Sequence, residues 1–382
     1  MTHPDTRSLL GIVSYRIYPA ENGGQQSIAT FYAELNKRVN LTLLVSRDNE
    51  PEPASNLSIF PVLYSGYLSW MNLLLVYKLS KLIRQREITC MLIDHSYYAW
   101  LAWILRRITG IPFIIRSHNI EAHRFKDLRR WYWQWYEKYE KWIHNRSNYN
   151  WWISRNDMKY ATKNWKISTN KSAVTTYGTL LRNEPDKAQK QAQRNQLLQA
   201  WNLPESVRLF YFNGSLNYAP NVEAIRTIVY DILPRLQQKN IPFRIIISGT
   251  GLSLAWQAVL ANYPEIVWVG FKNEIALYWE GSDCFINPVT LGSGIKTKLI
   301  ESLAHGLPSV STLSGMRGLE RPNLNKVLIG VPDYDWDTFT DRMVQVTNPD
   351  VKWRIPLEFF QEFSLPNIVQ GALLSLQTDA SH

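Results

Sequence analysis

The stretch Asp283–Glu320 restricts the fold of this 382-residue chain more than any other segment. A short apolar run, Cys284–Asn287, leads into the turn Gly292-Ser293-Gly294, and apolar residues then recur at helical spacing until the break at His305–Pro308. The next apolar run, Ser309–Thr312, has the length of a buried strand. This order predicts a strand, a glycine turn, a helix and a parallel strand. The start of such a helix suits a phosphate, because free backbone N–H groups and the helix dipole face the anion.

Apolar runs of strand length alternate with helical patterns through most of the chain, which is typical of an α/β protein with parallel sheets. The predicted strands are Leu9–Ser14, Leu41–Val45, Leu57–Val62, Cys90–Asp94, Pro112–Arg116 and Asn150–Ile153, then Leu209–Phe212, Phe243–Ser248, Ile266–Val269, Cys284–Asn287, Ser309–Ser311 and Val327–Ile329. The predicted helices are Gln25–Arg38, Tyr67–Arg86, Tyr97–Arg107 and 122–145, then Val222–Gln238, Leu252–Ala261, Glu274–Glu280 and Ile295–His305.

A polar stretch from Thr176 to Lys190 separates the two series of strands and helices. We therefore predict two Rossmann-like, doubly wound domains, residues 1–180 and 181–355. An apolar helical pattern over 356–382 is expected to pack back across the interface between them. In folds of this kind the ends of parallel strands and their loops line the substrate cleft.

Charge and composition narrow the classes of function. The net charge of +10 suits an acidic partner, which could be nucleic acid, an anionic bilayer or a phosphorylated substrate. Cys90 and Cys284 both lie in apolar runs, so we expect buried free thiols and a reducing, cytoplasmic compartment. No apolar run is long enough to cross a membrane. Metal-binding motifs and phosphate-binding Walker motifs are absent from the sequence, so we expect no metal and no other cofactor.

Seven short motifs follow one another along the chain: Gly23-Gly24, Arg116–Glu121, Tyr177-Gly178-Thr179, Phe212–Asn221, Ser248–Gly251, Gly270-Phe271 and Gly292–Glu301. In this order they resemble the motifs of the retaining glycosyltransferases of family 4, which have the GT-B fold. The resemblance implies two Rossmann-like domains that face a central cleft. It also implies transfer of a sugar from a nucleotide-diphosphate donor to an acceptor, with retention of the anomeric configuration and without a metal ion.

The resemblance also implies which residues form the site. Glu301 would bind the ribose hydroxyls, Lys298 would stabilise the leaving diphosphate, and His118 would touch the donor sugar. The other predicted substrate-binding residues are Gly23, Gly24, Arg116, Asn119, Gly214, Asn217, Gly249, Phe271, Lys272, Ser293, Gly294, Ile295, Lys296 and Thr297. Structural alternatives remain open: Lys298 and Glu301 could form a surface ion pair, and His118 could be a hydrogen-bonded structural residue.

Two departures from the family pattern affect the donor site. Members usually carry two glutamates eight positions apart, and here Glu301 fits the second while Ser293 stands at the first. Many members also carry an Arg and a Lys after the first strand of the nucleotide domain, where this chain has Ser215 and Pro220. Lys296, Lys298 and the helix start are the nearby substitutes for that charge. An alternative is a non-catalytic nucleotide-sugar-binding protein of the same fold.

A run of aromatic and basic residues at 131–142 is the last feature that bears on function. Trp and Tyr prefer the bilayer interface and basic residues favour anionic lipid, so this helix could dock on the inner face of a membrane. It could equally pack over the first sheet with its other face in water. We therefore expect a lipid-linked or polysaccharide acceptor. Without a nucleic-acid-binding motif, we do not expect a nucleic-acid partner.

Overall fold

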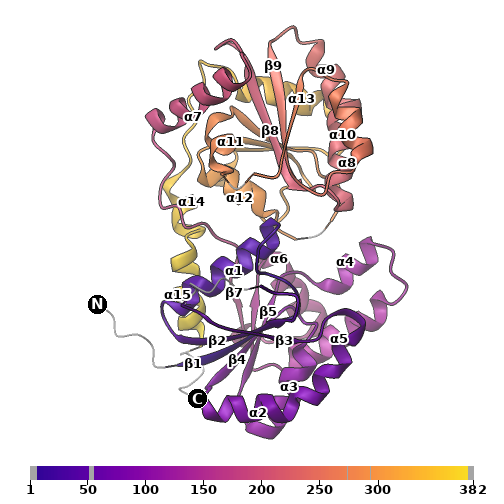
Figure 1. Cartoon of the computed structure of the whole chain (residues 1–382), viewed down its shortest axis with the longest axis vertical. Coiled ribbons are helices and arrows are strands. Elements are labelled where there is room, and N and C mark those ends of the chain that lie inside the picture. The colour runs from indigo at the N-terminus through magenta and orange to yellow at the C-terminus, as the bar shows by residue number, and fades with distance from the viewer. Residues whose placement is uncertain (1–6, 51–55, 273, 293, 377–382) are drawn as a thin grey trace. The chain divides into compact units, whose positions relative to one another are not determined.

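A computed structural model of the protein describes residues 7–50, 56–272, 274–292 and 294–376. The chain forms two compact units, one of Met1–Tyr177 together with Leu365–His382 and the other of Gly178–Ser364. Each unit is built on one parallel sheet with helices on both faces (Figure 1). The predicted α/β class with two doubly wound domains is confirmed. The units are described separately below.

The first unit contains a seven-stranded sheet in the order β3-β2-β1-β4-β5-β6-β7. Its strands are β1 (Ser8–Val13), β2 (Asn40–Ser46), β3 (Ser58–Leu63), β4 (Cys90–Asp94), β5 (Phe113–Ser117), β6 (Tyr149–Trp152) and β7 (Ser172–Val174). Its helices are α1 (Gly23–Asn36), the 3-10 helix η1 (Gly66–Leu75), α2 (Val76–Gln85), α3 (Ala99–Thr109), α4 (Glu121–Asp127), α5 (Trp133–Arg146), α6 (Arg155–Tyr160) and α15 (Leu365–Ser375).

Alternation of side chains along the strands gives this sheet two apolar faces. On one face α1 and α15 pack together, with Phe31 and Val369 in a single buried cluster. On the other face α2, α3 and α5 cover the sheet, with Ile83, Leu105 and Ile143 buried in a second cluster (Figure 1). Helix α15, the last helix of the described residues, is therefore part of the first unit.

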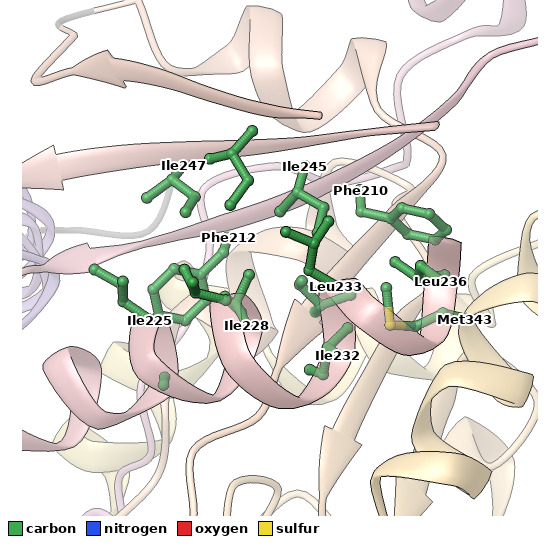
Figure 2. Packing of buried hydrophobic residues seen from close by; sticks show 14 of the residues in the cluster. Phe210, Phe212, Ile225, Ile228, Ile232, Leu233, Leu236, Ile245, Ile247 and Met343 are labelled. Carbon is green, nitrogen blue, oxygen red and sulfur yellow. The ribbon is translucent and has the colours of Figure 1, made fainter. Parts of the chain in front are cut away.

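The second unit contains a six-stranded sheet in the order β10-β9-β8-β11-β12-β13. Its strands are β8 (Arg208–Ser215), β9 (Phe243–Thr250), β10 (Ile266–Gly270), β11 (Cys284–Asn287), β12 (Ser309–Thr312) and β13 (Leu328–Val331). Its helices are α7 (Lys187–Ala200), α8 (Ala219–Thr227), α9 (Leu233–Gln237), α10 (Leu254–Ala261), α11 (Ala276–Gly281), α12 (Thr297–Ala304), α13 (Trp336–Val346) and α14 (Leu357–Glu362). A π-helical turn, Ile228–Ile232, joins α8 to α9, and Figure 2 shows Phe210 and Phe212 of β8 packed on this continuous helix.

The structure corrects several predicted elements. The helix predicted at Tyr67–Arg86 is the 3-10 helix η1 followed by α2. The long helix predicted over 122–145 is broken into α4 and α5, with Arg129 at a positive φ of 54° between them. Strand β7 and helices α6, α7 and α13 were not predicted. Helix α7 buries only Leu197 and Leu198, so its sequence lacks the apolar periodicity that would have identified it.

The C-terminal segment predicted as one helix over 356–382 contains two, α14 and α15. The chain passes from the first unit to the second after Tyr177, and returns to the first unit after Ser364. Thr179 and Ser364 form a parallel β-bridge, and the Thr179 N–H donates to the Phe363 carbonyl at 2.8 Å. Within the described ranges, no helix is both long and apolar enough to span a bilayer.

Candidate functional site

The second sheet changes direction between β8 and β11. Strands β8, β9 and β10 follow one another outward on one side, and β11, β12 and β13 do so on the other. In doubly wound sheets, ligands bind at the carboxyl ends of the strands at this change of direction. Helix α12 follows β11 and begins at Thr297, with Lys296 as its N-cap residue. The predicted helix start at Ile295 is therefore two residues early.

The predicted phosphate-binding turn lies between β11 and α12. Gly292 and Gly294 have φ values of 88° and 84°, which a residue with a Cβ atom rarely adopts. The Lys296 ammonium folds back on this turn and donates to the Gly292 carbonyl at 3.0 Å. Ile295 is buried against Gly318. The predicted site residue Ser293 lies outside the described residues.

Lys298 is buried, whereas the surface ion pair considered from the sequence would require an exposed side chain. Its ammonium reaches the end of β8 and donates to the Asn221 side-chain oxygen at 3.0 Å and to the Asn213 carbonyl at 3.3 Å. It also lies 4.5 Å from the centre of the Phe212 ring. Burial, and then the nearby charge of Lys296, lower the pKa of Lys298 from 10.5 to about 7. A buried ammonium whose partners in the described part of the chain are all neutral is suited to bind an anion.

Glu301 lies one helical turn further along α12 and is half-buried. Burial raises the pKa of its carboxyl group from 4.5 to about 7. Among the residues that the structure describes, no hydrogen bond or ion pair of this carboxylate is found, and Lys298 points to β8 instead. The surface ion pair between Lys298 and Glu301 does not form. An acceptor without a partner at this position suits the hydroxyl groups of a ligand.

Glycines bring the ends of β8 and β9 into close contact. Gly249 has a φ of 145°, and a Cβ atom there would lie 1.8 Å from the Gly214 carbonyl oxygen. Gly251 has a φ of 79° and packs against Asn217, whose side-chain oxygen accepts a hydrogen bond from Ser215 at 2.9 Å. The predicted residues Gly214, Asn217 and Gly249 therefore lie together at the carboxyl ends of β8 and β9.

The connection after β8 carries Ser215 and Pro220, where family members often have two cations. Asn221, directly after Pro220, links this connection to α12. Its amide donates to the Ser215 carbonyl at 2.9 Å and its oxygen accepts from Lys298. A lysine from another element therefore brings positive charge to this connection. Asn221 was not predicted as a site residue.

Phe271 and Lys272 follow β10 at the edge of the second sheet. Both side chains are exposed, and the preceding Gly270 has a φ of 72°. No contact places them beside Lys298, since β9 separates β10 from β8 in the sheet. Their predicted contact with the base of the donor stays a prediction.

A second polar cluster occupies the change of direction of the first sheet, between β1 and β4. Asp94 ends β4 and lies at its centre. The Asp94 carboxylate accepts hydrogen bonds from His118 Nε2 at 2.5 Å and from the Arg116 guanidinium at 3.3 Å. Arg116 is fully buried and its guanidinium stacks 3.7 Å from the centre of the Phe31 ring. The structure therefore brings the predicted residues Arg116 and His118 together around Asp94.

The ring of His118 is neutral and both of its nitrogen atoms are used. Burial, more than any neighbouring charge, lowers the pKa of His118 from 6.5 to about 3. Burial alone would raise the pKa of Asp94, but Arg116 and then His118 hold it well below its ordinary value. Nε2–H donates to Asp94, and Nδ1 accepts from the Tyr177 hydroxyl at 2.8 Å. The imidazole is thus held in place, and the backbone at His118 with it.

His95 forms a second layer on this cluster. Its ring stacks on His118 with centres 4.2 Å apart, and its φ of 61° places it in the left-handed region. Nε2 of His95 lies 2.7 Å from the Tyr15 hydroxyl, and Nδ1 lies 3.1 Å from Glu121. Strain of this kind in a non-glycine residue is common at functional sites.

Glu121 joins the remaining side chains of this layer. Its carboxylate accepts from Tyr97 at 2.6 Å and from Arg124 at 2.7 Å. The Asn119 amide contacts the same carboxylate at 3.4 Å. The predicted residue Asn119 is therefore tied to the cluster by its side chain.

Gly23 and Gly24 are the first two residues of α1. The Asn22 side chain caps this helix and accepts from the Gln25 N–H at 3.0 Å. The backbone N–H groups of both glycines therefore belong to the first turn of a 14-residue helix. Their contact with a phosphate stays a prediction.

Sequence reasoning missed three residues that organise these clusters: Asp94, Tyr177 and Asn221. The sequence did contain one signal for Asp94. Burying an acidic residue at the end of a fully apolar strand costs free energy unless its charge is paired, so a buried partner could have been expected. Among residues of described position, no group of three or more His, Cys, Asp or Glu side chains could hold a metal ion.

Two family models match the chain. The model of group 1 glycosyl transferases matches residues 207–348, and that of glycosyltransferase family 4 matches residues 21–178. No curated protein sequence is significantly similar.

Solved structures of similar fold cover almost the whole chain. Sucrose-phosphate synthase from Thermosynechococcus elongatus is 17% identical with a TM-score of 0.74, over 98% of this chain and 100% of its own. A glycosyltransferase from Rickettsia africae is 13% identical with a TM-score of 0.76, over 99% and 100%. HepE from Anabaena, in complex with UDP and glucose, is 13% identical with a TM-score of 0.71, over 96% and 99%. These likenesses confirm the predicted GT-B fold.

Proposed function

The chain belongs to the family 4, group 1 glycosyltransferases, and from this premise we propose that it transfers a sugar from a nucleoside-diphosphate donor with retention of the anomeric configuration. One observation carries the donor side of the proposal. Lys298 is a buried cation, has no acidic partner among the residues that the structure describes, and lies where the end of β8 meets the helix after the glycine turn. An anion bound beside Lys298 would raise the pKa of its ammonium group again, which burial has lowered.

The diphosphate would lie at the start of α12. Backbone N–H groups of the first turn and the ammonium groups of Lys296 and Lys298 would face it. Glu301, whose carboxylate is unpaired among the described residues, would accept hydrogen bonds from the ribose hydroxyls. The base would contact the backbone at Phe271 and Lys272, after β10.

In the transfer step, the acceptor hydroxyl oxygen bonds to the anomeric carbon while the bond from that carbon to the diphosphate oxygen breaks. The hydroxyl proton passes to the departing diphosphate oxygen, so no protein nucleophile is required. Negative charge grows on the diphosphate in this step, and Lys298 stabilises it more in the transition state than in the bound donor. His118, held by Asp94 and Tyr177, would offer its backbone carbonyl to the positive charge that develops on the sugar.

For the acceptor we propose a lipid-linked or polysaccharide glycan, bound by the first unit. The basic charge of the chain and the exposed aromatic side chains of the first unit, which include Tyr67 and Trp70, support an acceptor at an anionic membrane surface. We propose that the donor is bound and the sugar transferred without a metal ion. The chemistry of the lysines and the helix start supports this, because they supply the charge that a metal would otherwise bring.

The proposal is tested with a panel of nucleoside diphosphates and their sugars, beginning with UDP and UDP-glucose because HepE was crystallised with them. We expect one donor to raise the melting temperature and to release nucleoside diphosphate slowly in the absence of acceptor. Lys298→Met should lose both effects. Lys326→Met, an exposed lysine away from α12, is the matched control. Donor binding without any hydrolysis or transfer would instead support the non-catalytic alternative, and no binding at all would refute the donor site.

A further inference from the structure

The first unit presents a group of large apolar side chains to solvent on η1 and the start of α2. Tyr67, Leu68, Trp70, Leu73, Leu74 and Tyr77 are all exposed, and Trp70 and Leu74 have 61% and 67% of their surface accessible. We call these six residues the η1 patch. Soluble proteins seldom gather so many large apolar side chains on one short exposed segment, and such patches mark interaction sites.

The segment that carries the η1 patch is held in place from inside. Asn72 is fully buried, and its side chain both accepts from the Tyr64 N–H and donates to the Tyr64 carbonyl, each at 2.9 Å. The Tyr98 hydroxyl donates to the same carbonyl at 2.6 Å, and the Arg47 guanidinium stacks 3.7 Å from the centre of the Tyr64 ring. Leu75 packs on the cluster beneath α2 and α3. The outward side chains are therefore displayed by a fixed segment.

Basic residues continue from the η1 patch along α2. Tyr77, Lys81 and Arg84 recur at helical spacing and share the exposed face of the helix, while Leu79 and Ile83 are buried on the opposite face. Lys78 and Arg86 are also exposed. No Asp or Glu occurs anywhere in residues 64–86. An apolar, aromatic segment that is followed on α2 by exposed cations matches the interface of an anionic bilayer.

We propose that the η1 patch, with Lys78, Lys81 and Arg84, docks the first unit on an anionic lipid bilayer. Trp and Tyr rings and Leu side chains would enter the boundary between headgroups and acyl chains, and the lysines and the arginine would lie among the lipid phosphates. The inference deepens the proposed function, because it rests on an acceptor at a membrane and assigns the surface that reaches it. It also differs from the sequence-based expectation, which placed docking at residues 131–142.

The experiment measures sedimentation of the full chain with vesicles of phosphatidylglycerol and phosphatidylcholine, and with vesicles of phosphatidylcholine alone. We expect the wild type to prefer the anionic vesicles and to be released by salt. Trp70→Ser with Leu74→Ser should weaken binding at least about tenfold, and Lys78→Gln with Lys81→Gln and Arg84→Gln should remove the preference for anionic lipid. Both variants should keep the wild-type melting temperature, because the replaced side chains are exposed.

Trp131→Ser with Trp135→Ser is the matched control, since both tryptophans are exposed side chains of the first unit that lie in the segment 131–142. We expect this variant to bind vesicles within about threefold of the wild type, because it leaves the η1 patch and the cations of α2 unchanged. Three results would overturn the proposal: a wild type that does not bind anionic vesicles, an η1 variant that binds as well as the wild type, or loss of binding only in the control variant.

A second copy of the chain is the other possible occupant of the η1 patch. A dimeric wild type that fails to bind vesicles, together with a monomeric Trp70→Ser, Leu74→Ser variant, would assign the patch to self-association and refute membrane docking. Donor-dependent thermal shifts, measured without lipid on the same variants, keep the two proposals separate. They should be unchanged if the donor site is correct, whatever the vesicles show.

Discussion

Replacing Lys298 with Met should stabilise the folded protein while it removes donor binding. The pKa of Lys298 is lowered by burial from 10.5 to about 7. A tenfold change in proton affinity corresponds to about 1.4 kcal/mol, so the charged lysine costs the folded chain about 5 kcal/mol at neutral pH and below. Methionine has a similar length and no charge. It leaves the Asn213 carbonyl and the Asn221 side-chain oxygen without their donor, which costs about 2–3 kcal/mol in total.

The net gain should therefore be about 2 kcal/mol near pH 6.5, or a rise of about 4–8 °C in melting temperature. Its dependence on pH has a definite sign. Between pH 7 and 10.5 the unfolded chain still binds the Lys298 proton and the folded chain does not, so wild-type stability rises with pH in that range. The advantage of the variant should shrink by about 2.5 kcal/mol between pH 6.5 and pH 9, and so reverse its sign.

The assay is chemical unfolding of the wild type, Lys298→Met and Lys326→Met at several pH values, without ligand. Lys326 is exposed and serves as the control, for which we expect little change in stability at any of these pH values. If Lys298→Met were destabilised at pH 6.5, or if its difference from the wild type were the same at pH 6.5 and pH 9, the idea of a costly buried ammonium would be wrong.

The remaining predictions concern activity and the contact between the ends of β8 and β9. Glu301→Gln should lower kcat/KM by about 10- to 100-fold without lowering the melting temperature, because glutamine removes a charge that burial disfavours; wild-type kinetics would remove Glu301 from the site. The profile of kcat/KM against pH should be narrow and centred near pH 7, because Lys298 must carry its proton and Glu301 must lose its own; Lys298→Arg should extend the alkaline limb. Gly249→Ala should abolish donor binding and lower the melting temperature, because its Cβ atom would lie 1.8 Å from the Gly214 carbonyl oxygen; a variant with wild-type melting and binding would contradict the strand contact. Activity should survive EDTA, and a loss that Mg²⁺ restores would refute metal independence.

The strands were the part of the fold that the sequence predicted best, and the reason is burial. Runs such as Cys90–Asp94 and Cys284–Asn287 are buried along their whole length. Their sequences are therefore nearly continuous apolar segments, which is typical of buried parallel strands. Helix α7 escaped prediction because only Leu197 and Leu198 are buried in it, and its remaining residues are polar on all sides. Propensity alone does not outweigh a missing apolar face.

At the candidate site, the sequence did not allow us to predict the directions in which the side chains point. The position of Lys298 near the start of α12 was readable, but its burial was not, because the partner that receives it, Asn221, is far away in the sequence. Asp94 shows the same limit: its place at the end of β4 was predicted, whereas its pairing with Arg116 and His118 depends on the order of strands β4 and β5 in the sheet. Distant pairings of this kind have no local signal.

The discontinuity of the first unit determines the order in which its parts are made. Helix α15, which packs with α1 in one apolar cluster, is translated only after all of Gly178–Ser364. During synthesis the apolar surface around Phe31 and Leu35 therefore stays exposed to solvent until the second unit has emerged from the ribosome. The second unit has no such dependence, because its sheet is made from one continuous stretch of chain. Contrary to the order of the sequence, the unit that is begun first should be the last to complete its fold.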